Sequence, residues 1–194
     1  MKRIGLLGGT FDPPHLGHLL IAEEVRLALG LEEIWFIPSN VPPHKQTLTR
    51  TNDRVQMVER AIEDHPNFKM HTIELTRTGK SYTVDTMKSL QEMYPETRFS
   101  FIIGADMVEY LPKWHDIKTL IETVQFVGVQ RTGYSVETDL PVEIIDIPLF
   151  DVSSTMIRQR IASGVKVRYY LPDAVNSYIE EHELYGRRNT LTKT

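Results

Sequence analysis

Two histidines, His15 and His18, follow a glycine-rich turn and could hold a phosphate group between them. The turn stands between the apolar run 4–7, which predicts a buried strand, and the run 19–26, which predicts a helix. At such a junction the first turn of the helix offers unpaired backbone N–H groups and a partial positive charge. Because His15 and His18 are three residues apart, both imidazoles can lie on one face of that helix. The residues of this candidate phosphate site are Gly8, Gly9, Thr10, Phe11, His15 and His18.

The glycines of this stretch have a predicted purpose. Gly8 and Gly9 lack a Cβ, so the backbone could approach a bulky anion there, and Thr10 would add a hydroxyl donor. Gly17 stands in the first turn of the predicted helix, where it costs about 1 kcal/mol relative to Ala. A ligand packed against the backbone at Gly17 would account for that cost. The alternative is a plain turn with two capping or surface histidines, and the combination of residue types favours the phosphate site.

A second candidate phosphate site opens a later helix. Ser153 or Ser154 can cap its N-terminus, which leaves other hydroxyl and N–H groups, including those of Thr155, to bind an anion. Arg158 follows one turn later and can present two parallel donors to a phosphate. On its own this run would indicate a capped helix with an exposed arginine. The first site makes that alternative the weaker one.

Neither site carries a common phosphate-binding fingerprint. The chain has no G-x-G-x-x-G and no G-x-x-x-x-G-K at the first turn, which disfavours a dinucleotide dehydrogenase and a P-loop NTPase. The first turn instead resembles the H-x-G-H signature of the nucleotidyltransferase superfamily, whose members transfer a nucleoside monophosphate from a triphosphate. The run from Val152 to Arg158 resembles the (I/V)SST-x-(I/L)R motif of the same superfamily.

Further segments resemble the bacterial nicotinate-nucleotide adenylyltransferases, and most of all those of Gram-positive bacteria. The segments are 38–45, 79–86, 102–107 and 111–114, and the resemblance extends from Lys2 to about Tyr185. It implies that Trp114 stacks on a pyridine ring and that the region of Thr83 binds the ring carboxylate. It also implies that Gly104 and Asp106 contact ATP. His44 and Lys45 would bind substrate and offset the charge between the two substrates.

The resemblance implies adenylyl transfer from ATP to nicotinate mononucleotide, which gives nicotinate adenine dinucleotide and pyrophosphate. His15, His18 and Arg158 would be the catalytic residues. Mg²⁺ would be bound mainly through ATP oxygens, with no metal ligands from the protein. The alternatives are the same chemistry on nicotinamide mononucleotide, pantetheine phosphate or a cytidylyl-transfer substrate, and a non-catalytic nucleotide-binding regulator.

Some of these residues have a simpler explanation. Trp114 could be a core residue, although its place between Lys113 and His115 in a polar loop favours a ring platform. Thr83 could merely begin a helix. Trp35 is predicted to be core, and no role is predicted for three scattered histidines, His65, His71 and His182.

Composition bounds the class of protein. At 194 residues, with 41% hydrophobic and 25% charged residues, the chain suits one domain, 1–185, with a frayed tail at 186–194. A net charge of −4 argues against a nucleic-acid polymer as partner. The chain has no cysteine, which excludes disulfides and thiolate chemistry. No signal peptide or long apolar run is found, so we expect a cytoplasmic protein; a homodimer is left open.

Short apolar runs alternate with longer amphipathic ones along the chain. This order predicts an α/β fold, with a doubly wound, mostly parallel Rossmann-like sheet and helices on both faces. Predicted strands are 3–8, 33–38, 68–74, 98–104, 125–129 and 143–146. Predicted helices are 15–29, 51–64, 82–93, 120–123, 153–163 and 172–183.

Overall fold

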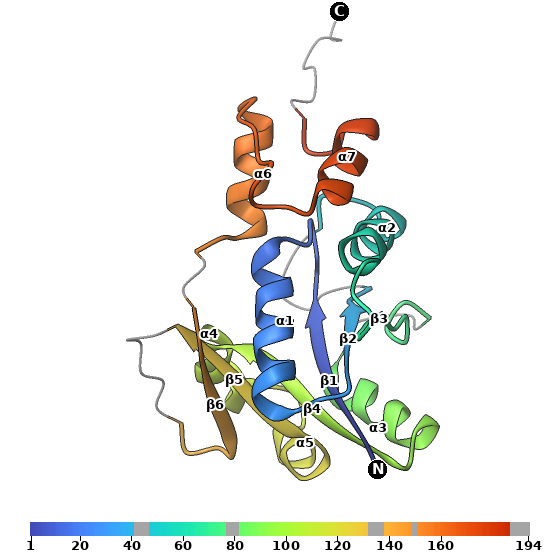
Figure 1. Ribbon diagram of the computed structural model, residues 1–194. Coiled ribbons are helices and arrows are strands. Elements are labelled where there is room, and N and C mark those ends of the chain that lie inside the picture. Colours follow the sequence, from blue (N-terminus) through green and yellow to red (C-terminus); the bar gives the residue numbers. More distant parts are fainter. Residues whose placement is uncertain (41–46, 77–81, 132–137, 149–150, 187–194) are drawn as a thin grey trace, which may run out of the picture.

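The computed structural model describes residues 1–40, 47–76, 82–131, 138–148 and 151–186 (Figure 1). Six strands form one sheet in the order β3-β2-β1-β4-β5-β6, and every neighbouring pair is parallel. The predicted α/β class and parallel sheet are therefore confirmed. The strands are β1 (Lys2–Gly9), β2 (Glu33–Pro38), β3 (Phe68–Met70), β4 (Thr97–Gly104), β5 (Gln125–Arg131) and β6 (Val142–Ile147).

Helices cover both faces of the sheet. One core cluster packs the sheet against α3, α4 and α5, and a second packs it against α1 and α2. A third cluster joins α2, α6 and α7 beside the sheet. The helices are α1 (Leu16–Leu29), α2 (Thr51–Ile62), α3 (Thr83–Met93), α4 (Ala105–Tyr110), α5 (Ile117–Thr123), α6 (Ser154–Ala162) and α7 (Asp173–Glu181), with a 3-10 turn at Leu111–Lys113.

The structure corrects some predicted elements. β3 ends at Met70, because Glu74 at the end of the predicted strand turns back toward α3 and accepts a hydrogen bond from Thr86 Oγ1 at 3.0 Å. Helix α4 and the following 3-10 turn were not predicted, since elements this short show no clear period. Helix α5 begins at Ile117 and buries Leu120. Trp35 is core as predicted, at 7% exposure.

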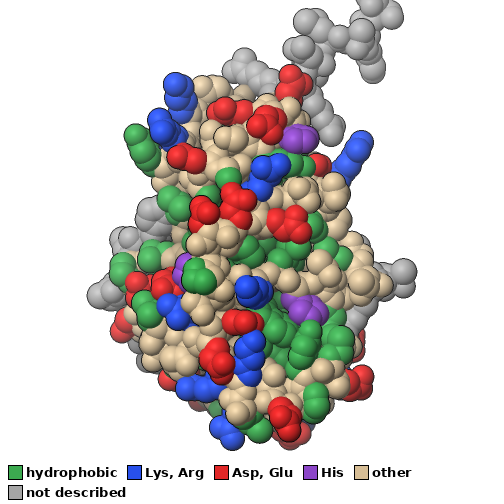
Figure 2. All heavy atoms as spheres, turned by 45° about the vertical axis from the view of Figure 1, so that its right-hand side comes forward, with side chains coloured by type: hydrophobic (Ala, Val, Ile, Leu, Met, Phe, Trp, Pro, Cys, Tyr) green, Lys and Arg blue, Asp and Glu red, His purple; other side chains and the backbone are tan. Residues whose placement is uncertain are grey.

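The surface carries mixed charges. On the face shown in Figure 2, lysines and arginines are interspersed with acidic side chains and form no broad basic area. Among the residues that the structure describes, no helix is both long enough and apolar enough to cross a membrane.

Candidate functional site

The predicted site residues lie at the carboxyl edge of the sheet. β1 and β4 are neighbours, and the chain runs outward from them in opposite directions, so the strand order reverses between them. Parallel α/β sheets bind ligands in the crevice at this point. Gly9 ends β1 and Gly104 ends β4, and a Cβ at Gly104 would meet nothing within 4 Å. The end of β4 therefore faces open space.

His15 and His18 are held together at the start of α1. His15 is the residue before the first helical turn, and its imidazole stacks on that of His18 with ring centroids 3.7 Å apart. The backbone N–H of His15 donates to His18 Nδ1 at 3.2 Å. Because Nδ1 accepts this bond, a neutral His18 carries its proton on Nε2. That tautomer makes Nε2 a hydrogen-bond donor.

His15 is buried and neutral. It is 7% exposed, and burial lowers the pKa of its imidazole from 6.5 to about 4. Its Nδ1 atom has no hydrogen-bond partner among the described residues. At neutral pH the pair can therefore offer N–H groups to a phosphate, with no fixed positive charge from His15.

The shifted pKa of His15 predicts a loss of stability in acid. Between pH 6.5 and about 4 the unfolded chain protonates this histidine while the folded protein does not, so the free energy of unfolding falls as the pH falls. The full effect is about 3 kcal/mol. Urea unfolding between pH 4 and pH 7 should give a shallower pH dependence for His15→Asn than for wild type. Burial also lowers the pKa of His71, so His71→Asn should make the pH dependence shallower in the same way. Equal slopes for His15→Asn and wild type would contradict the burial effect.

The first loop joins β1 to α1 and comprises residues 10–15. The glycines that flank it serve packing within the protein. A Cβ at Gly9 would lie 2.8 Å from the ring of Phe11, and one at Gly8 would lie 3.3 Å from the ring of Phe101. A Cβ at Gly17 would lie 2.7 Å from Val152 Cγ1. The prediction that Gly17 makes room for a ligand was therefore wrong, because Val152 occupies that space.

Phe11 supports the loop from inside the core. It is 1% exposed, and its ring packs edge-on against His18 with centroids 5.0 Å apart. Its φ of 51° lies in the left-handed region, which a bulky residue rarely adopts. The predicted ATP contact therefore cannot come from its ring, which instead supports the imidazole of His18.

Helix α6 lies against the first loop and joins the two candidate phosphate sites. The cap is Ser153, whose Oγ accepts from the N–H of Met156 at 3.2 Å. Ser154 Oγ is not spare as expected, because it donates to the carbonyl of Pro13 at 2.8 Å. Arg158 donates through Nη1 to the carbonyl of Asp12 at 2.7 Å and through Nη2 to Thr155 Oγ1 at 3.1 Å.

Asp12 is a site residue that the sequence pattern alone does not reveal. Its side chain is 3% exposed, and its carboxylate accepts hydrogen bonds from Leu48 N–H at 2.8 Å, Thr49 Oγ1 at 2.7 Å and Tyr185 Oη at 2.7 Å. Together with the Arg158 bond to its carbonyl, these contacts join three separate segments of the chain to the first loop. Its place between Phe11 and Pro13 in the glycine-rich turn was the available signal.

Arg54 was also missed. This α2 residue is completely buried and donates through Nη1 to the carbonyl of Thr10 at 2.8 Å. Its Nη2 donates to the carbonyl of Asn40 at 3.3 Å and to Thr51 Oγ1 at 3.2 Å. Burial lowers the pKa of its guanidinium. A cation is thus fixed beneath the first loop, where it favours a bound anion.

A second group of predicted residues lies together near the start of α3. Thr83 is the first residue of that helix, and the ring of the preceding Tyr82 packs on His115 at 4.6 Å. Trp114 is half-buried, with its ring nearly perpendicular to those of Phe101 and Phe126 at 6.0 Å. Since Phe101 also lies beside Gly8, its ring connects this region to the first loop.

The structure does not describe the side chains of three predicted residues, His44, Lys45 and Asp106. His44 and Lys45 are outside the described residues. Asp106 belongs to the first turn of α4, at the end of β4, but its side chain is not described. The described part of the chain contains no cluster of three or more His, Asp or Glu residues that could hold a metal ion.

Comparison with known proteins decides the family. Residues 6–160 match the cytidylyltransferase-like family. The chain is 57% identical to the probable nicotinate-nucleotide adenylyltransferase of Oceanobacillus iheyensis, over 96% of this chain and 98% of that protein. It is 51% identical to the nicotinate-nucleotide adenylyltransferase of Bacillus subtilis, over 95% and 99%. The chain belongs to the nicotinate-nucleotide adenylyltransferase family.

Solved structures of nicotinate-nucleotide adenylyltransferases share this fold. The nicotinic acid mononucleotide adenylyltransferase of Plasmodium falciparum, complexed with NaAD, superposes with a TM-score of 0.79 at 22% identity, covering 95% of this chain and 98% of that chain. A putative enzyme of Vibrio parahaemolyticus gives 0.70 at 21% identity, covering 97% of each chain. These likenesses establish the fold alone.

Proposed function

We propose that this chain transfers the adenylyl group of ATP to nicotinate mononucleotide, releasing pyrophosphate and forming nicotinate adenine dinucleotide. The observation that carries the proposal is the junction of the two phosphate sites. The stacked imidazoles of His15 and His18 lie at the start of α1, directly after the loop whose Asp12 carbonyl accepts from Arg158. Its relatives over nearly the full length of the chain are nicotinate-nucleotide adenylyltransferases.

The reaction needs alignment and charge stabilisation. The phosphate of the mononucleotide is already an anionic nucleophile at neutral pH, so it requires neither a general base nor a covalent enzyme intermediate. Its oxygen attacks the α-phosphorus of ATP while the bond to the bridging oxygen of pyrophosphate breaks. Donors placed where negative charge develops lower the barrier most.

His18 and His15 would bind the triphosphate around the transferred group. His18 Nε2 is the donating nitrogen because Nδ1 accepts from the backbone. The stacked ring of His15 fixes the imidazole plane of His18 on one side, and the edge contact with Phe11 limits its movement further. A donor held in place before the reaction needs no rearrangement in the transition state.

The start of α6 would bind the departing pyrophosphate. Its first turn presents backbone N–H groups next to Ser153 and Thr155, and Arg158 adds a guanidinium with further N–H groups. Both terminal nitrogens of Arg158 are already fixed by Asp12 and Thr155, so the guanidinium plane is set before ATP binds.

Mg²⁺ would arrive as part of the ATP complex. The described residues offer no carboxylate cluster, and the Asp12 carboxylate is already used by three donors of the protein. This donor set suits an ion held by phosphate oxygens and water. Bound in that way, Mg²⁺ neutralises charge on the triphosphate.

The region of Thr83 and Trp114 would bind nicotinate mononucleotide. Trp114 would stack on the pyridine ring, and N–H donors near Thr83 would bind the ring carboxylate. His44 and Lys45 would offset the charge between the two substrates. A carboxamide cannot satisfy the same donors equally, so nicotinamide mononucleotide should be the poorer acceptor.

Truncating Trp114 should weaken binding of the mononucleotide and leave ATP almost unaffected. An aromatic stack adds about 0.5–1.5 kcal/mol, so the KM for nicotinate mononucleotide in Trp114→Ala should rise several-fold. Trp114→Phe keeps an aromatic face and should recover part of this loss. Steady-state kinetics with each substrate varied in turn will check it. Equal increases in both KM values would mean that Trp114 is a core residue.

An acceptor panel tests the proposed function. Pyrophosphate release from ATP should require nicotinate mononucleotide, with weaker release for nicotinamide mononucleotide and none for pantetheine phosphate. Binding of ATP without turnover on any acceptor would indicate the non-catalytic regulator instead. We further infer that the enzyme is cytoplasmic. Its partners would be these small molecules, with no nucleic-acid polymer. Light scattering will determine whether it forms a homodimer.

A further inference from the structure

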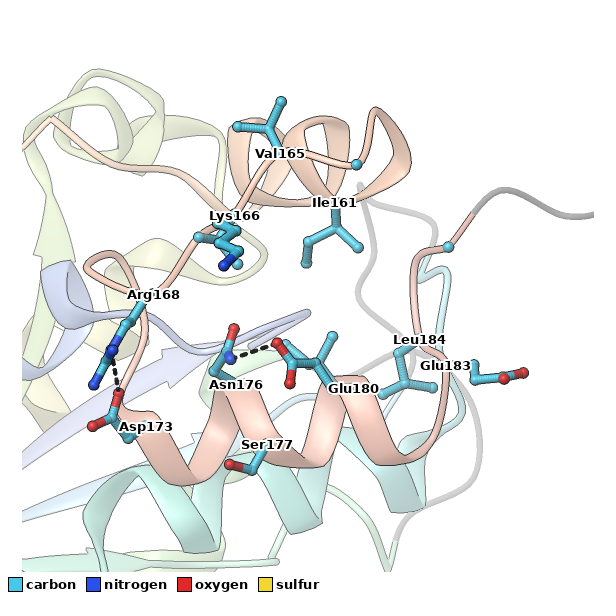
Figure 3. A pocket seen from close by; sticks show the side chains of 14 residues that line it. Ile161, Val165, Lys166, Arg168, Asp173, Asn176, Ser177, Glu180, Glu183 and Leu184 are labelled. Carbon is cyan, nitrogen blue, oxygen red and sulfur yellow. Dashed lines mark hydrogen bonds and ion pairs between the residues drawn. The ribbon is translucent and has the colours of Figure 1, made fainter.

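The C-terminal segment reaches the first loop through one side chain. After α7 the chain turns back, with Leu184 N–H donating to the carbonyl of Ile179 at 3.0 Å. Figure 3 shows Leu184 at the end of the groove between α6 and α7. The next residue, Tyr185, points its hydroxyl to Asp12 Oδ1 at 2.7 Å. Tyr185 lies beyond residues 6–160, which match the family model.

The backbone and the side chain of Tyr185 are both held in place. The φ of Tyr185 is 62°, in the left-handed region, so its backbone has an uncommon conformation. Burial and the Asp12 carboxylate together raise the pKa of its phenol, which therefore stays protonated and donates. The side chain packs partly buried in the cluster that joins α2, α6 and α7.

Asp12 links Tyr185 to the candidate active site, because it is hydrogen-bonded to both Tyr185 and Arg158. Its carboxylate is fixed at Oδ1 by Tyr185 and Thr49 and at Oδ2 by the N–H of Leu48. Its backbone carbonyl, a few bonds away, accepts from Arg158 at 2.7 Å. The Asp12 carbonyl is thus one of two contacts that orient the Arg158 guanidinium, and Thr155 Oγ1 is the other.

We propose that Tyr185 is a positioning residue for ATP, acting through Asp12 on Arg158. The proposal presupposes the adenylyl transfer described above. Removing the hydroxyl takes away one of the two donors to Asp12 Oδ1, leaving Thr49, and lets the first loop and Arg158 shift together. Small misplacements of a group that binds the reacting phosphates are costly, so we expect about a tenfold fall in kcat/KM for ATP. The KM for nicotinate mononucleotide should change less than about twofold, since Tyr185 has no described contact with that region.

The chain offers a matched control. Tyr178, on α7, donates to Asp53 Oδ1 at 3.0 Å, so it makes the same kind of tyrosine–aspartate bond in the same cluster. Asp53 has no described contact with the first loop. Tyr178→Phe should therefore lower the melting temperature about as much as Tyr185→Phe while leaving kcat/KM for ATP unchanged.

The test combines these two variants with Asp12→Asn in steady-state kinetics and thermal melts. We expect the ATP-specific loss in Tyr185→Phe and in Asp12→Asn but not in Tyr178→Phe. Adding Tyr185→Phe to Asp12→Asn should cause little further loss, because both act on one pathway. Equal kcat/KM for Tyr185→Phe and Tyr178→Phe would overturn the role of Tyr185 and leave adenylyl transfer intact. A Tyr185→Phe protein that fails to fold would also overturn it, since the hydroxyl would then be structural. An inactive wild-type protein would overturn both claims.

Discussion

His18→Ala should reduce turnover by about 100- to 1,000-fold, the usual cost of removing one preorganised donor to developing charge. Wild-type His18 is fixed by the His15 N–H at Nδ1 and by aromatic contacts with His15 and Phe11. The orientation of its imidazole is therefore fixed before ATP binds. Measuring kcat for pyrophosphate release, with saturating ATP and nicotinate mononucleotide, gives the size of this contribution.

Two controls separate catalysis from folding in this experiment. A thermal melt should show a much smaller loss in stability than in turnover, because His18 is only partly buried. His182→Ala removes a histidine that stacks on Tyr178 at 4.0 Å in α7, and it should keep wild-type kcat. A folded His18→Ala protein with nearly normal turnover would refute the role given to His18.

Arg158→Lys should also be severely impaired, with about a 100-fold lower kcat/KM for ATP. The guanidinium holds the Asp12 carbonyl and Thr155 Oγ1 with two nitrogens and still has N–H groups for a phosphate. A lysine ammonium is a single point charge, so it cannot make these contacts and grip the phosphate in the same planar geometry. Binding of nicotinate mononucleotide alone, followed by calorimetry, should change little.

Arg160→Lys provides the matched control for Arg158. Arg160 belongs to the same helix, but its guanidinium lies over the ring of Tyr170 at 5.2 Å. We expect wild-type kinetics for this variant. Normal kcat and ATP affinity in Arg158→Lys would reduce Arg158 to a structural residue of a capped helix.

Residue patterns predict most of the architecture, because its long helices and strands have a regular spacing of apolar residues. The amphipathic period of α1 and α7 and the apolar run of β1 each extend over enough residues to reveal the element. The six residues of α4 do not. The early end of β3 depends on Glu74 meeting Thr86, a tertiary contact that leaves no local signal.

The candidate site was predictable in its residue types and less so in its contacts. The spacing of His15 and His18 brings their rings together, since His15 immediately precedes the first turn of α1 and His18 belongs to that turn. The space beside Gly17 is filled by Val152, which is far away in the sequence. The proximity of Gly17 and Val152 cannot be read from the sequence, so the glycine was wrongly explained by a ligand packed against it.

Charged residues that act from inside the protein were the hardest to predict. Arg54 stands in an amphipathic helix, where an arginine is normally read as facing solvent. Only the fold shows that it is buried and donates to the carbonyl of Thr10. Asp12 similarly gains its importance from Tyr185, its hydrogen-bond partner at the other end of the chain.

Following the α-phosphorus of ATP tests the central claim most directly. ATP labelled at that atom is incubated with the enzyme and either nicotinate mononucleotide or nicotinamide mononucleotide, and the products are separated by chromatography. The label should appear in nicotinate adenine dinucleotide with a clearly higher kcat/KM than in the nicotinamide product, because an unpaired donor near Thr83 costs about 1–3 kcal/mol. Label that stays in ATP with both acceptors would contradict adenylyl transfer, and equal kcat/KM values would contradict the account of the acceptor pocket.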